Sequence, residues 1–282
     1  MMTNFSVVDD TFDPGVTSSY FLSIQISLDG FSFCTLDPVR NKYIQFQHIQ
    51  FDKSLPLSQQ VEESFLRNEK LNLPYKKTLV LMPTNKSTLV PSALFEQSKK
   101  EQWLKFCHQI PEDHLVFYNK IKMADAYNVF AVPNAIHELL IRQFLDPLFF
   151  HQYTPVIESN LAINISGREK TLLFINLANN YFDLFAFKNN NLKLCNSYSI
   201  KTENDFIYFT LFVFEQLKLQ PADTEILISG YHTNGEEMIR HLRRYIRKVK
   251  QVSIPHHFQY SHMFREINNQ PFYNLLSLPV CV

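Results

Sequence analysis

Glycine and paired cysteines are both scarce in this chain. Only five of its 282 residues are glycine, so there are few places where a backbone could close tightly around a phosphate group. The four cysteines lie far apart and form no Cys-x-x-Cys pair: Cys34, Cys107, Cys195 and Cys281. This spacing argues against a disulfide framework and favours free thiols in a reducing compartment, so we expect a cytoplasmic protein.

An excess of charge and a long apolar run are missing as well. Lys plus Arg equals Asp plus Glu at 27 each, which removes a global attraction for nucleic acid or acidic membranes. Residues 1–19 lack the positive start and apolar core of a signal peptide. The most apolar run, residues 206–214, is too short for a hydrocarbon layer that needs about 20 residues, so the sequence predicts no membrane span.

The common catalytic motifs are not found. The chain contains no Gly-x-Ser-x-Gly, no Gly-x-x-x-x-Gly-Lys and no His-Glu-x-x-His. His256, His257 and His262 lie close together, but they include no i,i+4 pair and no cysteine accompanies them. We interpret them as ordinary loop or partly buried histidines rather than metal ligands.

Apolar residues make up 45% of the chain, with 26 Phe and 13 Tyr, which is enough for two hydrophobic cores. From Phe21 an alternating run, the turn pair Asp29-Gly30 and a second alternating run predict a β-hairpin. The elements expected next are a strand over 43–51, a helix over 57–68 capped by Ser58, a strand over 78–82, a helix opening at Pro91 and Ser92, strands over 115–121 and 128–132, and a helix over 134–145.

The second half repeats this order. Strands are expected over 171–176, 181–187, 192–200 and 225–229, a buried helix opened by the capping pair Thr202 and Asp205, a helix over 236–250, and a last strand over 252–254. A strand meander followed by helix, strand, helix and strand, given twice, indicates a duplicated α/β architecture.

Three segments carry a resemblance to a known superfamily: residues 24–27 with their hairpin, residues 175–178 with their hairpin, and residues 226–230. Their order resembles the actin-like ATPase superfamily, which implies duplicated ribonuclease H-like lobes. Residues 90–95 and 271–276 make the pilus-assembly adaptor branch the most similar, and the chain also looks like an uncharacterised bacterial family of unknown function with this fold. The lobes would then be residues 1–153, to which 270–282 return, and residues 154–269.

The resemblance also implies a degenerate nucleotide cleft. The superfamily has Asp-x-Gly in each hairpin, because carboxylates organise magnesium and glycine lets backbone amides approach phosphate. The corresponding positions here are Gln25 and Ser27 in the first hairpin and Asn176 and Ala178 in the second. The resemblance gives Gly230 to the adenosine loop, which has Ser229 in place of its first glycine, and Asp29 in the first turn could substitute for a lost carboxylate. Both hairpin carboxylates and both hairpin glycines are therefore replaced, and Asp29 is explained more simply as a turn residue.

We therefore expect no catalytic residues and no cofactor, with ATP and Mg²⁺ not favoured, and a scaffold that binds protein partners. The alternative is a nucleotide sensor or weak ATP-dependent enzyme holding its ligand with Gln25, Asn176 and Gly230. Nucleic-acid binding through the basic helix over 236–250 is a third and weaker reading, because a solvated face that satisfies the helix dipole explains the same pattern. We expect the Phe-rich helix over 205–217 to pack in the core rather than form a partner groove.

Overall fold

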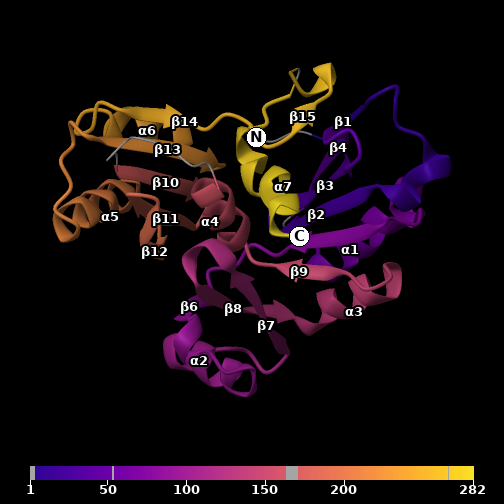
Figure 1. The fold of residues 1–282 in the computed structure, drawn as a ribbon, viewed down its shortest axis with the longest axis horizontal. Helices are drawn as coiled ribbons and strands as arrows, with labels where there is room; N and C mark the ends of the chain where they lie inside the picture. The colour runs from indigo at the N-terminus through magenta and orange to yellow at the C-terminus, as the bar shows by residue number, and fades with distance from the viewer. Residues whose placement is uncertain (1–3, 53, 163–170, 266) are drawn as a thin grey trace. The chain divides into compact units, whose positions relative to one another are not determined.

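The computed structural model describes residues 4–52, 54–162, 171–265 and 267–282. The chain divides into two compact units: unit 1 is residues 1–158, 255–268 and 274–282, and unit 2 is residues 159–254 and 269–273 (Figure 1). These units differ from the lobes expected from the sequence, because residues 154–158 and 255–268 lie in unit 1 and residues 270–273 lie in unit 2.

Unit 1 is built on a mixed sheet with the order β1-β4-β3-β2-β5-β9, and β15 also pairs with β4. The strands are β1 (Phe5–Val8), β2 (Phe21–Ser27), β3 (Gly30–Asp37), β4 (Lys42–Gln50), β5 (Lys77–Leu81), β9 (Leu148–Phe150) and β15 (Gln259–Tyr260). The predicted meander β2-β3-β4 is antiparallel, while β5 joins β2 in parallel. The hairpin loop is Leu28-Asp29 rather than the expected Asp29-Gly30, because Ser27 pairs with Gly30.

Both faces of this sheet are covered. Alternate residues of β2 and β3, among them Ile24 and Phe33, pack in one core with α1 (Leu57–Leu66) and α3 (Asn134–Gln143). On the opposite face the Tyr43 hydroxyl donates to the Leu276 carbonyl at 2.7 Å, and Phe264 packs against the rings of Tyr43 and Phe46. This cover comes from the end of the chain, where α7 spans Tyr273–Ser277.

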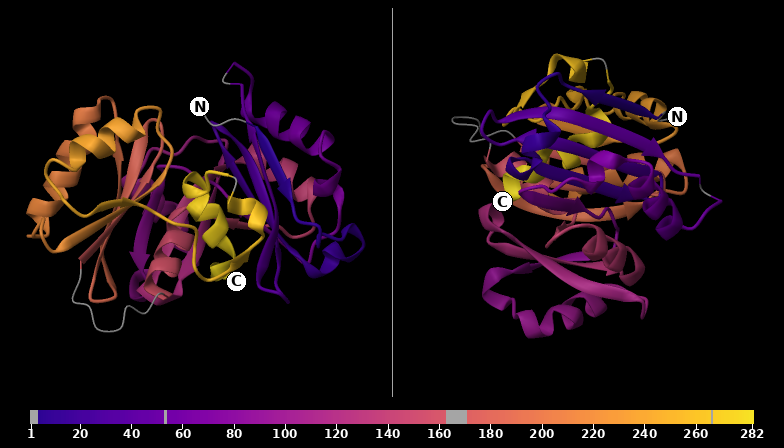
Figure 2. Two further views of the ribbon diagram at one scale, coloured as in Figure 1. Left: turned by 90° about the horizontal axis from the view of Figure 1, so that it is seen from above. Right: turned by 90° about the vertical axis from the view of Figure 1, so that its right-hand side faces the viewer.

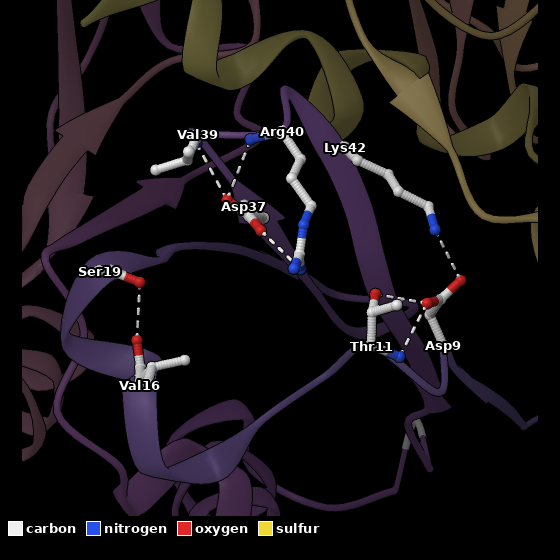
Figure 3. A network of polar contacts seen from close by, with 8 residues as sticks. All are labelled: Asp9, Thr11, Val16, Ser19, Asp37, Val39, Arg40 and Lys42. Carbon is white, nitrogen blue, oxygen red and sulfur yellow. Dashed lines mark hydrogen bonds and ion pairs between the residues drawn. The ribbon is translucent and has the colours of Figure 1, made fainter.

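Polar contacts fix the entry into β4 (Figure 3). Asp9 forms an ion pair with Lys42 at 3.0 Å and accepts the Thr11 amide at 2.9 Å. Burial alone raises the pKa of Asp9, but hydrogen bonds from Ser261, Thr11 and Lys42 outweigh it and hold the pKa well below its usual range. Asp37 accepts the backbone amides of Val39 and Arg40, closing the turn before β4.

A second sheet of unit 1 has the order β6-β8-β7. Its strands are β6 (Ser87–Pro91), β7 (His114–Ile121) and β8 (Ala126–Pro133), with α2 (Lys100–Cys107) on one face, drawn in magenta in Figure 2. Leu104 of α2 packs against Val90, Val116 and Val129, a small core of its own. The predicted start of this helix at Pro91 and Ser92 was wrong, because Pro91 ends β6 and α2 begins at Lys100.

A buried histidine joins this sheet to the chain beyond β5 and β9. The Nε2 of His151 lies 2.8 Å from the Thr84 carbonyl, which can only accept, so Nε2 carries the proton. Nδ1 then accepts from the Asn128 side-chain amide at 2.9 Å and from the Tyr153 backbone amide at 3.2 Å. Burial lowers the pKa of His151 to about 3, so its ring is neutral at physiological pH.

Unit 2 contains one sheet with the order β12-β11-β10-β13-β14. Its strands are β10 (Thr171–Leu177), β11 (Tyr181–Lys188), β12 (Asn191–Ser199), β13 (Thr224–Gly230) and β14 (Val249–Gln251). Two helices, α5 (Glu203–Gln216) and α6 (Gly235–Leu242), share its core, to which Phe206 and Leu242 contribute. A further helix, α4 (Tyr153–Ala162), contains the boundary between the units.

Several predicted helix limits need correction. No side chain caps α1, whose N-cap is Pro56 rather than Ser58. The capping box of Thr202 and Asp205 at the start of α5 is confirmed. However, α5 is not buried all round, because it packs on one side only and leaves Tyr208 62% and Phe212 38% exposed.

The helix expected over 236–250 ends at Leu242, and the strand expected over 252–254 is β14, three residues earlier. Among the described residues, no helix is long and apolar enough to cross a membrane.

Candidate functional site

The first predicted hairpin places Gln25 and Ser27 on β2 and Asp29 in its loop. The Ser27 hydroxyl donates back across the loop to the Gly30 carbonyl at 3.2 Å. The Asp29 carbonyl accepts the Phe51 amide at 3.2 Å, so this loop is tied to the end of β4. All three candidate side chains are half-buried, and they share one hairpin of unit 1.

Two residues that the sequence did not single out continue from Gln25 across the sheet. Gln25 pairs with Ser32 on β3, and Ser32 pairs with His48 on β4. The Ser32 hydroxyl and His48 Nδ1 are hydrogen-bonded at 2.8 Å, and both residues are buried. Burial lowers the pKa of His48 to about 4, so a neutral imidazole, and not a carboxylate, lies beside the first hairpin.

Gly30 makes room for this imidazole. A Cβ at position 30 would lie 2.7 Å from His48 Cε1 and 2.6 Å from the Ile49 carbonyl oxygen. Both distances are shorter than van der Waals contact allows. The glycine of this hairpin is therefore required by packing between β3 and β4.

The second hairpin places Asn176 at the end of β10, opposite Asp183 on β11. The Asn176 side-chain amide donates to one Asp183 carboxylate oxygen at 3.2 Å, and the Ser197 hydroxyl donates to the other. Asp183 is fully buried. The Ala178 amide donates to the Tyr181 carbonyl at 2.9 Å and closes the loop.

Gly230, at the end of β13, has a positive φ of 82°. A Cβ there would lie 2.1 Å from the Leu177 carbonyl oxygen and 2.5 Å from the Leu177 amide nitrogen. The neighbouring Ser229 hydroxyl donates to the Gln270 carbonyl at 2.9 Å. Only glycine fits here, because β10 and β13 approach each other so closely and because L residues rarely adopt this conformation.

The structure thus brings the six predicted positions together in two groups, each within its own unit: Gln25, Ser27 and Asp29 in unit 1, and Asn176, Ala178 and Gly230 in unit 2. Magnesium requires oxygen ligands that are free to coordinate it. Both oxygens of Asp183 accept hydrogen bonds from its neighbours, and the described residues hold no group of three or more His, Cys, Asp or Glu able to bind a metal.

Comparison with solved structures identifies the class of fold. A Bacteroides thetaiotaomicron protein described as having an actin-like ATPase fold and unknown function is similar over 95% of this chain and 99% of its own, with 24% identity and a TM-score of 0.81. The PilM–PilN type IV pilus biogenesis complex contains a chain similar over 91% of this one and 96% of its own, with 11% identity and a TM-score of 0.59. The chain therefore has the actin-like ATPase fold, as the sequence predicted.

The family follows from the sequence comparison. The chain belongs to the family described as "Protein of unknown function (DUF3822)", which matches residues 9–249. No curated protein matches it.

Proposed function

We propose that this protein is a non-hydrolytic actin-like scaffold that works by binding other proteins. The observation that carries the proposal is the pairing of Asn176 with the buried Asp183. In a hydrolytic site a carboxylate must reach the metal or its water ligands. Here the position of the second hairpin carboxylate is an amide, and the adjacent carboxylate is held by Asn176 and Ser197.

Packing roles of the two glycines support the same proposal. Gly30 accommodates His48, and Gly230 accommodates the backbone of Leu177. Each glycine therefore has a structural reason for its presence, and neither requires a phosphate to explain it.

A protein partner is favoured by one structural neighbour. PilM, whose fold this chain resembles, is found in a complex with PilN.

A cytoplasmic location fits the cysteines. All four cysteines are free, and Cys107 is exposed on α2. Exposed free thiols persist in a reducing compartment.

Calorimetric titration with ATP and ADP in the presence of Mg²⁺, beside an assay of phosphate release, tests the proposal. We expect no phosphate release and no saturable binding at nucleotide concentrations up to about 1 mM. A dissociation constant of about 1 mM corresponds to a binding free energy of roughly 4 kcal/mol. The informative variant is Gln25→Ala, with Gln59→Ala on the exposed side of α1 as its matched control.

Saturable binding that Gln25→Ala weakens and Gln59→Ala does not would contradict the expected absence of a ligand and support the nucleotide sensor. Phosphate release that Asp29→Ala abolishes would overturn the scaffold.

A further inference from the structure

The segment from Met238 to Lys250 contains six Lys or Arg residues and no Asp or Glu. Because α6 ends at Leu242, the helix dipole accounts only for basic residues in its last turn, such as Arg240. Beyond Leu242 the chain continues through single turns, in which Arg244 donates its amide to the His241 carbonyl at 3.1 Å, and it then enters β14. The remaining cations need another explanation.

Three of the six cations have structural partners. The guanidinium of Arg243 donates to the Val249 carbonyl at 3.2 and 3.3 Å. Lys248 donates to the Ala222 carbonyl, and Lys250 forms an ion pair with Glu225 at 2.7 Å. These contacts attach the end of α6 and β14 to the rest of unit 2.

The other three cations, Arg240, Arg244 and Arg247, are exposed, and no hydrogen bond or ion pair joins their side chains to any residue in the described part of the chain. We call them the arginine surface. Arg240 lies in α6, and Arg244 and Arg247 lie in the turn and bend that join α6 to β14. Met238, Leu242 and Ile246 in the same stretch are fully buried.

The acidic residues near the arginine surface do not neutralise its positive charge. Glu237, in the first turn of α6, lies 3.8 Å from His241, and Glu236 is exposed. Within the described residues neither forms an ion pair with Arg240. Tyr245, which is 56% exposed, follows Arg244 directly in the chain. Arg and Tyr are, with Trp, the residue types enriched among those that dominate the binding energy of protein interfaces.

We infer that the arginine surface binds an acidic segment of a partner protein, an inference that rests on the proposed scaffold function. A guanidinium binds a carboxylate through two parallel hydrogen bonds, so three arginines match a short segment with a few Asp or Glu side chains. A nucleic acid fits less well: Glu236 and Glu237 at the start of α6 would repel a continuous phosphate backbone, and the whole chain carries no net positive charge.

Fluorescence anisotropy tests this inference on the full chain. The probe is a labelled peptide of about 15 residues, rich in Glu and with one Tyr, and its comparison peptide has Gln in place of each Glu. We expect the Glu peptide to bind at about 50 mM salt and more weakly at higher salt, and the Gln peptide not to bind. The double variant Arg244→Gln with Arg247→Gln should weaken binding by about tenfold or more.

The matched control is Lys188→Gln with Lys193→Gln, which removes the same charge from exposed positions elsewhere in unit 2. It should leave the affinity nearly unchanged. Neither double variant removes a contact inside the protein, so both should melt at the wild-type temperature.

Equal weakening by both double variants would mean unspecific attraction and overturn the inference. So would no binding of the Glu peptide, or tighter binding of a 20-nucleotide single-stranded DNA. The nucleotide titration is a separate readout: a silent titration with failed peptide binding rejects only this surface, whereas phosphate release rejects the scaffold itself.

Discussion

At the end of β13, the geometry depends on the absence of one side chain. Gly230 and Leu177 pair in parallel register, and the backbone of Leu177 occupies the space where a Cβ would lie. The resemblance found in the sequence placed this glycine in the adenosine loop. The close approach of the two strands accounts for it without a ligand.

We therefore predict that Gly230→Ala lowers the free energy of unfolding by about 2 kcal/mol or more, because overpacking and a strained φ each cost roughly 1–3 kcal/mol. Urea unfolding monitored by circular dichroism measures the change. Gly235→Ala is the control: its Cβ would meet its nearest neighbours at an ordinary 3.7 Å, and we expect little loss. If both substitutions lowered the free energy of unfolding equally, the clash with the Leu177 backbone would not be the cause.

The two hairpins that carry the candidate residues could be predicted from the sequence, but the partners of their side chains could not. Asn176 and Ala178 were correctly placed around the second hairpin loop. Asp183 was missed because its importance arises from lying opposite Asn176, seven residues away. Counting outward from the expected loop at 178–180 would have paired Asn176 with Phe182, one residue off, because the Ala178 amide donates to Tyr181 and only Asn179 and Asn180 lie between them. To predict that His48 lies near Gln25, one would need the register of β2 with β3 and of β3 with β4. The second register contains a bulge that the sequence does not reveal.

At the scale of the elements, the neutral side chain of His151 connects the β6-β8-β7 sheet to the loop after β5. His151 accepts from Asn128 on β8 and donates to Thr84, beyond β5. A protonated ring could not accept from Asn128 and would place an uncompensated charge in a buried site.

This gives a pH dependence with a definite sign. The pKa of His151 is about 3 in the folded protein and about 6.5 in an unfolded chain, so the unfolded chain binds more protons between these values. Stability from this residue is complete above about pH 6.5 and is lost as the pH falls towards 3, at up to about 1.4 kcal/mol per pH unit. His48 acts in the same direction, with a folded pKa of about 4.

Urea unfolding at several pH values between 7.5 and 4 checks this prediction. His151→Gln should be less stable at neutral pH and should show a shallower loss of stability as the pH falls. His262→Gln, which removes an exposed imidazole, is the control and should keep the wild-type slope. An unchanged slope in His151→Gln would exclude this residue as a source of the acid sensitivity.

Elements with clear periodicity were predicted well, and short ones were not. Alternating apolar residues correctly indicated β2, β3 and β4. The strands β1 and β9 have only four and three residues, too few for a periodic pattern. The predicted helix over 236–250 was too long, because Ile246 and Val249 continue the apolar spacing although the chain has already left α6.

For the molecule as a whole, the duplicated plan was readable from the sequence, but the composition of unit 1 was not. Unit 1 takes residues from three separate stretches of the chain. The return of residues 255–268 was missed, since their pairing strand, β15, has only two residues.

Leu276 lies in the last of these stretches and is fully buried in unit 1. We predict that Leu276→Ala costs about 2–5 kcal/mol of stability by removing buried methyl groups and leaving a cavity. Trp103 is the only tryptophan and belongs to unit 1, so its fluorescence during urea unfolding reports on that unit.

Leu145→Ala is the control, because Leu145 is 97% exposed and its truncation should leave the transition in place. A fluorescence transition unchanged by Leu276→Ala would mean that the end of the chain does not stabilise unit 1.

The hydrogen bond from Tyr43 to Leu276 joins residues 233 positions apart, and it has a consequence for synthesis on the ribosome. Unit 2 is complete once residue 273 has emerged from the ribosome. Unit 1 still lacks residues 274–282, which help to cover the face of its sheet that carries Tyr43. Closing so long a loop is slow compared with forming local contacts. The half-covered sheet of unit 1 is therefore the surface that a nascent chain exposes longest, and the one that chaperones should recognise.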